Sequence, residues 1–369
     1  MHVFESNLTE KLINNLKIKP TNLSEWKQRH YLTGYLNKNQ KVKIYIISGQ
    51  WYGRTDIHRL SYNHDGTLMN CDVPCIWNMT DLGDLTPEEL KTADALFCVD
   101  EQILPEKKSW EGQKFVQLTI EPYITCPWCI NDVERWDFRS TFNEKSEVPT
   151  SYIRSDPNIW RTKEPFNVEN LEKNSAIISF IASHWTDFRR DLVPKLQAHI
   201  PIASFGAVHH NTDWNIHPDC EALEKNTIKH YEDFNAKNCI IEKYPFYLSI
   251  ENSQEPDYSS EKLWDPFKLG VVPIVWGAPN TRSYLTHPKS AIFIEDYPNV
   301  EDLANHLKYL VENKTAYLEY HQWRTMTNWS DGFEKKAYMS LYNMECNVCK
   351  EVARLRVIER RVNFSEPYF

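Results

Sequence analysis

The segment from residue 244 to residue 277 constrains the fold of this chain more than any other part of the sequence. Apolar residues alternate over 244–253, a helix start follows at Ser259, and residues 271–277 are again mostly apolar and β-branched. The first and last parts have the period of strands, and the middle part has that of a helix. Two strands joined through a helix run parallel, so the segment predicts a βαβ unit in an α/β protein.

The same alternation recurs along the rest of the chain. Strand patterns occupy residues 42–48, 93–99, 115–120, 175–182 and 200–206. A capped helix start is expected at Thr86, because Pro87 suits the first helical position and Glu89 can bond back to the cap. Further helical patterns occupy residues 187–198, 300–311, 316–324, 332–343 and 346–360.

The length of 369 residues corresponds to about two domains of roughly 150 residues each. Residues 131–173 are polar, contain three prolines and show no sustained period, so we expect the crossing between the domains there, near residue 165. The sequence therefore predicts an α/β domain over 1–165, a second over 166–345, and a helical tail over 346–369.

Composition narrows the range of partners. The net charge of −9 supplies no basic surface for phosphate backbones, so nucleic acid is not an expected partner. No run approaches the roughly 18 apolar residues of a membrane span, and the first residues lack a basic-then-apolar signal pattern. We expect no membrane span in this chain. Sequons at six asparagines favour a secretory lumen only slightly.

The nine cysteines include two Cys-x-x-Cys pairs, Cys126/Cys129 and Cys346/Cys349. Their separation is far from the usual zinc-site spacing, and no thioredoxin-like pattern precedes the first pair. Disulfides within or between the pairs are the preferred interpretation if the compartment is oxidising, and a zinc site is the alternative.

Several polar residues gather at the carboxyl end of the strand at 244–253. Asn252, Tyr258, Glu261 and Lys262 surround the following helix start, where N–H groups and the helix dipole favour a phosphate. Lys262 would neutralise a pyrophosphate, Tyr258 would stack or hydrogen-bond, and Glu261 would accept from sugar hydroxyls. The alternative is an ordinary Glu-Lys pair on the first turn of a surface helix.

This stretch resembles the α1,3-fucosyltransferase family. Its signature appears here as Tyr244-x-Phe246-x-Leu248-x-x-Glu251-Asn252, Asp257-Tyr258-x-x-Glu261-Lys262-Leu263 and a strand ending in Pro273, Ile274 and Gly277. The resemblance covers most of residues 175–325, and the tail around Cys346 and Cys349 looks like the divergent core- or protein-directed branches rather than the Lewis-type branch. It implies an α/β fold of the GT-B type, with two Rossmann-like domains facing a central cleft and a helical C-terminal tail. GDP-fucose would bind in the domain at 166–345, and the acceptor mainly in the domain at 1–165.

The family's donor-binding residues carry over to Asn252, Tyr258, Glu261 and Lys262, and its phosphate-binding arginine to Arg189. Arg190 takes that role if the alignment of this sequence with the family pattern shifts by one residue. A planar guanidinium suits bidentate phosphate contacts. One departure is Pro245, where family members usually have a basic residue. His209 and His210 are expected as loop structure, with contact to guanine or ribose as the alternative.

An inverting transfer needs a base that accepts the proton of the attacking hydroxyl. In this family the base is a glutamate after an N-terminal strand, and Glu121 matches that place, where Pro122 would end the strand. Glu134 and Asp137 in the following loop are the substitutes, and a glutamate that merely marks a strand end is the structural alternative.

No Asp-x-Asp pair occurs in the sequence, although such pairs commonly hold the metal of nucleotide-sugar transferases. We therefore expect no obligatory metal or other cofactor, with Arg189 and Lys262 supplying the positive charge.

The resemblance implies transfer of L-fucose from GDP-fucose in α1,3 linkage to GlcNAc or glucose of a glycan or glycoprotein. Transfer to Ser or Thr of a protein, a binding protein without turnover, and another nucleotide-sugar donor are the alternatives. The Golgi or ER lumen is implied by the family, and the cytoplasm is the alternative because no signal or anchor pattern is seen.

Overall fold

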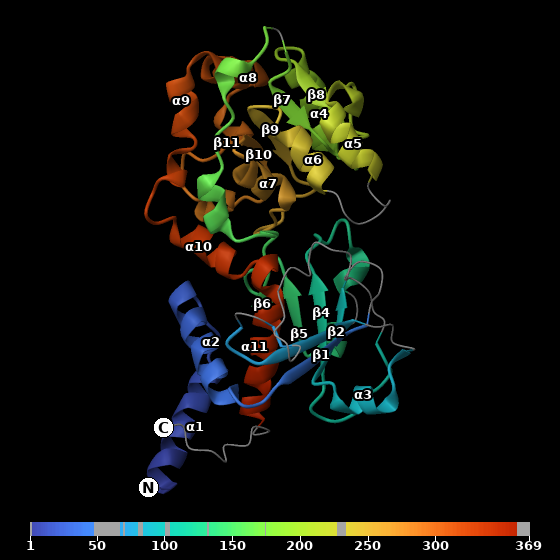
Figure 1. Cartoon of the computed structure of the whole chain (residues 1–369), viewed down its shortest axis with the longest axis vertical. Helices are drawn as coiled ribbons and strands as arrows, with labels where there is room; N and C mark the ends of the chain where they lie inside the picture. Colours follow the sequence, from blue (N-terminus) through green and yellow to red (C-terminus); the bar gives the residue numbers. More distant parts are fainter. Residues whose placement is uncertain are drawn as a thin grey trace. The chain divides into compact units, whose positions relative to one another are not determined.

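The chain forms two compact units, shown in a computed structural model (Figure 1). The first unit consists of Met1–Arg154 and Tyr338–Phe369, and the second of Ser155–Ala337. This division differs from the expected boundaries at 165 and 345, because the chain returns to the first unit before its C-terminal helix. The structure describes residues 2–47, 67–68, 71–79, 84–99, 104–130, 133–173, 175–226 and 234–359.

The described part of the first unit is built on a parallel sheet with the strand order β2-β1-β3-β4-β5-β6. Its strands are β1 (Val42–Ile46), β2 (Cys75–Met79), β3 (Ala95–Val99), β4 (Lys114–Thr119), β5 (Phe138–Thr141) and β6 (Val148–Pro149). The strands expected at 93–99 and 115–120 are confirmed, and so is the strand expected at 42–48 as far as the described residues reach, since residue 48 lies outside them.

The helix α3 (Pro87–Thr92) begins as the sequence predicts. Thr86 accepts from the backbone N–H of Glu89, and the Glu89 side chain accepts from the backbone N–H of Thr86. This reciprocal pair satisfies two N–H groups that the first helical turn cannot bond itself.

Strands β5 and β6 lie inside the stretch that the sequence indicated as a crossing between domains. They contain four and two residues, which is too short for an alternating pattern to stand out. The first unit therefore extends its sheet further along the chain than the sequence predicts.

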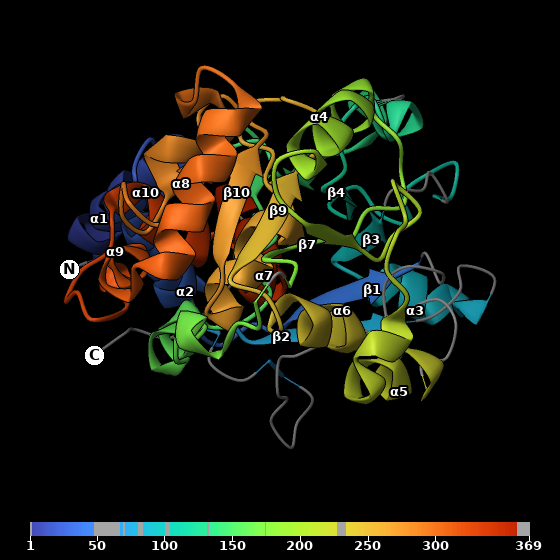
Figure 2. The same ribbon diagram turned by 90° about the horizontal axis from the view of Figure 1, so that it is seen from above.

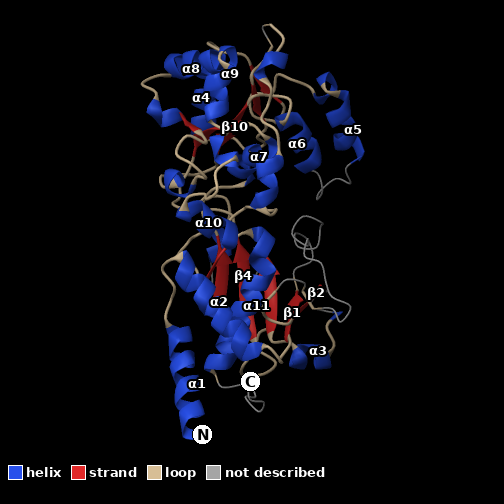
Figure 3. Ribbon diagram, turned by 60° about the vertical axis from the view of Figure 1, so that its left-hand side comes forward, coloured by secondary structure: helices blue, strands red, loops and turns tan. Residues whose placement is uncertain are grey.

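Three helices from the two ends of the chain pack together in the first unit: α1 (His2–Lys17), α2 (Leu23–Asn37) and α11 (Met344–Ile358) (Figures 1 and 3). Leu16, Leu36 and Val357 form their shared apolar cluster. Arg29 on α2 pairs with Glu351 on α11, with 2.7 Å between Nη2 and Oε2. The C-terminal helix is thus an internal part of the first unit.

The second unit has its own parallel sheet, with the strand order β11-β10-β9-β7-β8 in the described residues. The strands are β7 (Ile178–Phe180), β8 (Ile202–Ser204), β9 (Phe246–Ile250), β10 (Val272–Trp276) and β11 (Ile292–Phe293). The β9–α7–β10 segment is the predicted βαβ unit, since β9 and β10 pair in parallel and α7 (Glu261–Leu269) connects them.

Helices cover both faces of this sheet (Figure 2). Leu192 of α4 (Asp187–Gln197) and Leu307 of α8 (Val300–Glu312) belong to the main apolar core with the strands. Ile241 of α6 (Phe234–Ile241) and Leu269 of α7 form a smaller cluster with Tyr247 of β9. The remaining helices of the unit are α5 (Pro218–Asn226), α9 (Lys314–Glu319) and α10 (Asp331–Tyr338), the last of which ends in the first unit.

Within the described residues, no helix combines the length and apolar character that crossing a bilayer would require.

Candidate active site

The expected donor-binding residues of the second unit lie where β9 ends and α7 begins. Glu251 and Asn252 directly follow β9, and Ser260 is the N-cap of α7, accepting from the backbone N–H of Lys262. The hydroxyl of Ser249 on β9 donates to the backbone carbonyl of Lys262 at 2.6 Å. Hydrogen bonds therefore hold the end of β9 directly against the start of α7.

Glu251 organises this junction. Its Oε1 accepts from the backbone N–H of Ser260 at 2.7 Å, and its Oε2 accepts from the Ser260 hydroxyl at 2.7 Å. Burial raises the pKa of this carboxyl, and the positive charge of Lys262 only partly opposes the shift. The neighbouring Gly277 is required here, because a Cβ at that position would lie 2.9 Å from Cγ of Glu251. The sequence signature included Glu251, but its structural role was not predicted.

Lys262 is a nearly buried cation, with 13% of its side chain exposed. Its Nζ lies 3.3 Å from Oε1 of Glu261, 3.6 Å from Oε2 of Glu251 and 3.0 Å from the Ser260 hydroxyl. Burial acts to lower its pKa, but the two carboxylates outweigh burial and raise the pKa above its ordinary value. Lys262 therefore carries its charge at neutral pH.

Lys237 of α6 joins the same cluster, although no sequence pattern singles it out. Its Nζ lies 3.0 Å from Oε1 of Glu261 and 3.7 Å from Oδ2 of Asp265. Glu261 is thus held between two lysines. No spacing rule links Lys237 to a helix that begins more than twenty residues later, so only the fold brings these charges together.

Arg189 lies at the same carboxyl ends of the strands, on the first turn of α4, and is 1% exposed. Its guanidinium donates to the backbone carbonyls of His184 and Ile250. Burial lowers the pKa of Arg189, while Glu251 acts in the opposite direction. Its Nε has no hydrogen-bond partner within the described chain.

Arg190, the alternative to Arg189, is 62% exposed and pairs with Asp187 on its own helix at 3.6 Å. The geometry therefore favours Arg189 for the phosphate-binding role, which stays a prediction. Pro245 precedes β9, so it lies at the opposite end of the strand from this cluster.

Asn252 and Tyr258 differ in how accessible they are to a ligand. Oδ1 of Asn252 is buried and has no hydrogen-bond partner within the described chain. Tyr258 is 1% exposed, which leaves its ring no free face for a base to stack on. The turn before it is shaped by Asp257, whose φ is +70° and whose backbone N–H donates to Oδ1 of Asn280 at 2.8 Å. The hydrogen-bonding role of Tyr258 stays a prediction, and the stacking role is not supported.

Glu121, the expected base, belongs to the first unit and follows the end of β4. Its Oε1 accepts from the Tyr152 hydroxyl at 2.9 Å, and its Oε2 accepts from the Thr125 hydroxyl at 3.3 Å. The carboxylate is half-buried and has no cation among these contacts. Two neutral donors therefore orient it.

Asp137 and Glu134, the alternatives to Glu121, are less suitable as the catalytic base. Asp137 pairs with Lys108 at 2.6 Å and accepts from the backbone N–H of Phe115 at 2.7 Å, so its carboxylate is already engaged where β4 and β5 begin. Glu134 is exposed on a short 3₁₀ helix, Val133–Arg135. The role of Glu121 stays a prediction, and the geometry supports it over both alternatives.

The cysteines form disulfides in four pairs: Cys71–Cys346, Cys75–Cys349, Cys126–Cys129 and Cys220–Cys239. The expectation of disulfides is confirmed, although the second Cys-x-x-Cys pair bonds to Cys71 and Cys75 rather than to the first pair.

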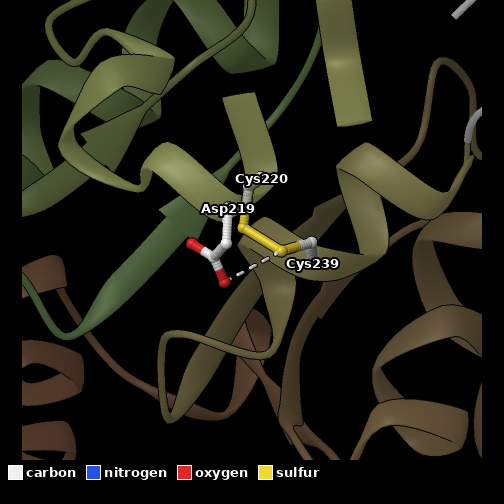
Figure 4. A group of neighbouring side chains, drawn as sticks. All are labelled: Asp219, Cys220 and Cys239. Carbon is white, nitrogen blue, oxygen red and sulfur yellow. Dashed lines mark hydrogen bonds between the residues drawn. A yellow bond between two sulfur atoms is a disulfide. The ribbon is translucent and has the colours of Figure 1, made fainter. Parts of the chain in front are cut away.

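In the described residues, the group with the spacing of metal ligands is Asp219, Cys220 and Cys239 (Figure 4). Its two sulfur atoms are bonded to each other, and Asp219 pairs with Lys243 at 2.5 Å. Disulfide sulfurs offer no thiolate to a metal, so this group is a structural crosslink.

The second unit therefore places a helix N-terminus and buried cations at the carboxyl ends of parallel strands. This combination defines a nucleotide-binding class of α/β protein. The sequence profile of glycosyltransferase family 10 (fucosyltransferase), C-terminal part, matches residues 171–364. The chain belongs to this fucosyltransferase family, which confirms the resemblance seen in the sequence.

Among its relatives, GDP-fucose protein O-fucosyltransferase 3 of Xenopus laevis is 29% identical over 247 residues, which cover 63% of this chain and 49% of that protein. Alpha-(1,3)-fucosyltransferase B of Drosophila melanogaster is 31% identical over 198 residues, which cover 52% of this chain and 43% of that protein. The chain spans about half the length of these curated relatives.

A solved structure described as alpha1,3-fucosyltransferase with GDP-fucose aligns at 17% identity over 89% of this chain and 94% of that one, with a TM-score of 0.48. The expected fold class, α/β of the GT-B type with two Rossmann-like units and a helical C-terminus, is confirmed by the two parallel sheets and α11.

Proposed function

We propose that this protein transfers L-fucose from GDP-fucose to an acceptor hydroxyl with inversion at the sugar carbon. The observation that carries the proposal is the buried cluster of cations and carboxylates at the carboxyl end of β9, where α4 and α7 begin, in a chain of the fucosyltransferase family. Donor binding is assigned to the second unit and acceptor binding mainly to the first.

The cluster contains equal numbers of cations and carboxylates. Its members are Arg189, Lys237, Lys262, Glu251, Glu261 and Asp265. A diphosphate would therefore compete with Glu251 and Glu261 for the lysine charges. The unpaired Nε of Arg189 and Oδ1 of Asn252 are a donor and an acceptor that a nucleotide sugar would satisfy.

In the proposed reaction the carboxylate of Glu121 accepts the proton of the acceptor hydroxyl. The hydroxyl oxygen forms a bond to C1 of fucose on the face opposite the nucleotide, while the bond from C1 to the phosphate oxygen breaks. The departing GDP takes the electron pair, and Arg189 and Lys262 stabilise its growing negative charge. These side chains supply the positive charge, so the proposal includes no obligatory metal.

The proposed acceptor is a GlcNAc or glucose residue of a glycan, fucosylated in α1,3 linkage. Transfer to Ser or Thr of a protein is the second candidate, because several matched relatives are named GDP-fucose protein O-fucosyltransferase 3. The four disulfides support an oxidising compartment, and we propose the lumen of the Golgi or ER rather than the cytoplasm.

A donor and acceptor array with GDP release as the readout tests this proposal. GDP-fucose is offered with GlcNAc-terminated glycans and with Ser/Thr peptides, with and without EDTA, and GDP-mannose and UDP-GlcNAc serve as competing donors. We expect release from GDP-fucose with the glycans and no effect of EDTA. Binding of GDP-fucose without release on any acceptor would instead establish a binding protein without turnover.

The base is tested by Glu121→Gln, which keeps the shape of the side chain and removes its basicity. We expect turnover to fall at least about 100-fold with the Kd for GDP-fucose unchanged. Glu134→Gln is the matched control and should keep full turnover. Equal turnover in wild type and Glu121→Gln would refute the assignment.

Lys262→Met tests the donor site. Loss of this charge should weaken GDP binding by about tenfold or more in calorimetry, since a charged hydrogen bond contributes about 1.5–3 kcal/mol. Lys268→Met in the last turn of the same helix is the control, with an expected Kd equal to that of wild type. Unchanged affinity in Lys262→Met would count against the cluster as the diphosphate site.

A further inference from the structure

Six Asn-x-Ser/Thr sequons occur in the chain, and the proposed mechanism uses none of them. Such a tripeptide is the acceptor sequence of N-linked glycosylation in secreted and lumenal proteins. The structure describes every side chain of three sequons, which begin at Asn22, Asn313 and Asn328. The residues of these three sequons contribute differently to the fold, so the structure distinguishes among them.

The sequon at Asn328 is explained by the fold. The hydroxyl of Ser330, its third residue, donates to the backbone carbonyl of Leu285 at 2.5 Å and accepts from the backbone N–H of Phe333 at 3.1 Å. Ser330 stands directly before α10 and satisfies an N–H of its first turn. Its hydroxyl is therefore accounted for without any modification of Asn328.

Asn313 connects two helices and caps the second of them. It is the C-cap of α8 and the N-cap of α9 (Figure 1). Its Oδ1 accepts from the backbone N–H of Ala316 at 3.1 Å, and its Nδ2 donates to the hydroxyl of Tyr309 at 3.1 Å in an exposed position. A sugar on Nδ2 replaces one of its two N–H bonds and leaves Oδ1 unchanged. The folded chain therefore accepts a glycan here without losing the cap of α9.

The third residue of this sequon is not required by the fold. Thr315 is exposed on the first turn of α9, and its hydroxyl makes no hydrogen bond within the described residues. Threonine is also a poorer helix former than alanine or lysine. The hydroxyl that the helix does not use is the group that completes the sequon.

An aromatic ring lies beside the amide nitrogen that would carry the sugar. Tyr309 precedes Asn313 by one helical turn on α8 and is 51% exposed. Because Nδ2 lies within hydrogen-bond distance of the Tyr309 hydroxyl, a sugar attached to Nδ2 starts next to this ring and covers part of its apolar surface. Asn22 differs, since its Nδ2 lies 3.5 Å from the hydroxyl of Thr21, a side chain without a ring.

Asn313 lies at the opposite end of the sheet from the proposed donor site. The hydroxyl of Tyr317 on α9 donates to the backbone carbonyl of Pro245 at 3.0 Å, and Pro245 precedes β9. The helix α9 is therefore at the amino end of β9, whereas the cluster around Lys262 is at its carboxyl end. A glycan at Asn313 leaves the donor site uncovered.

We propose that Asn313 is an N-glycosylation site and that the first sugar residue of its glycan lies against Tyr309. The co-reactant is an oligosaccharide on a lipid diphosphate. Nδ2 forms a bond to C1 of the first GlcNAc and gives up a proton, while the bond from C1 to the phosphate oxygen breaks and the lipid diphosphate takes the electron pair. This inference rests on the lumenal compartment of the proposed function.

Peptide mapping by mass spectrometry tests the site on the full chain, directed into the ER lumen by a cleavable leader peptide. Hydrolysis of an N-glycan at its amide bond converts the asparagine to aspartate, so the peptide with Asn313 should show that change after enzymatic deglycosylation. Thr315→Ala should abolish the modification, and Thr315→Ser should keep it. Both variants should fold, because the position is exposed and alanine is a good helix former.

Nitration by tetranitromethane tests the contact with the ring. Tyr309 should react faster in Thr315→Ala than in wild type, because no sugar covers it. Asn313→Asp should match Thr315→Ala, since aspartate keeps the helix cap but offers no amide nitrogen. An unmodified Asn313 in the wild-type chain would overturn the site, and equal nitration of the modified and unmodified chains would overturn the contact.

GDP release from GDP-fucose, measured on the same preparations, separates this inference from the proposed function. Thr315→Ala should release GDP at the rate of wild type, because the glycan lies away from the donor site. A chain that is modified at Asn313 but neither binds GDP-fucose nor releases GDP would overturn the proposed function and support the glycosylation site.

Discussion

The two disulfides Cys71–Cys346 and Cys75–Cys349 should stabilise the first unit in a strongly non-additive way. Each joins residues about 275 positions apart and ties the start of α11 to the region of β2. In the chain-entropy relation, closing a loop of this length in the unfolded state stabilises the fold by about 5.6 kcal/mol. Once one bridge exists, the other closes a ring of only about seven residues, which contributes about 2.4 kcal/mol.

Removing either bridge alone should therefore lower the free energy of unfolding by about 2.4 kcal/mol, because the other bridge still closes the long loop. The Cys75→Ala/Cys349→Ala variant should lose about 1 kcal/mol more, because Nε1 of Trp77 donates to Sγ of Cys349 at 3.0 Å. Removing both bridges should cost about 8 kcal/mol, which is comparable with the whole stability of a typical domain.

Guanidinium unfolding followed by hydrogen exchange of α11 is the appropriate measurement, because the exchange reports on the first unit alone. Cys220→Ala/Cys239→Ala is the control, since that bridge belongs to the second unit and should leave exchange in α11 unchanged. If the fourfold variant loses no more than the sum of the two single-bridge variants, the serial loop-closure reasoning is refuted.

Three further predictions concern the donor cluster. Gly277→Ala should displace Glu251 and weaken GDP binding, because its Cβ would lie 2.9 Å from Cγ of that glutamate; equal Kd values would contradict this. Arg189→Lys should weaken GDP binding by about tenfold or more, because an ammonium cannot reproduce the guanidinium contacts, whereas Arg190→Lys should bind as wild type does in the same titration. Because burial raises the pKa of Glu251, its carboxyl group in the folded state keeps its proton at pH values above 4.5, the ordinary pKa of a glutamate. Its contribution to stability is therefore present below that pH and is lost as the pH rises through the raised pKa, so Glu251→Gln should flatten the pH dependence of the unfolding free energy in this range.

Much of the second unit follows directly from the sequence, because its signals are local. The alternation before Glu251, the cap at Ser260 and the apolar strand that follows define the βαβ unit without any distant contact. The same holds for Thr86 and Glu89, whose capping pair needs only the spacing of one helical turn.

The parts that the sequence did not predict depend on contacts between distant segments. β5 and β6 are too short to show a period. β5 forms because it pairs with β4, and β6 forms because it pairs with β5. Lys237 reaches Glu261 from another helix, and no pattern in the sequence relates the two.

The class of fold, the polar residues after β9 and the family can all be predicted from short stretches with characteristic spacing. The cysteine pairing, the place of α11 in the first unit and the position of Arg189, rather than Arg190, at the end of β9 emerge only from the folded chain. They depend on burial and pairing, which are properties of the assembled chain. A side chain acquires its partners only when segments far apart in sequence pack against each other.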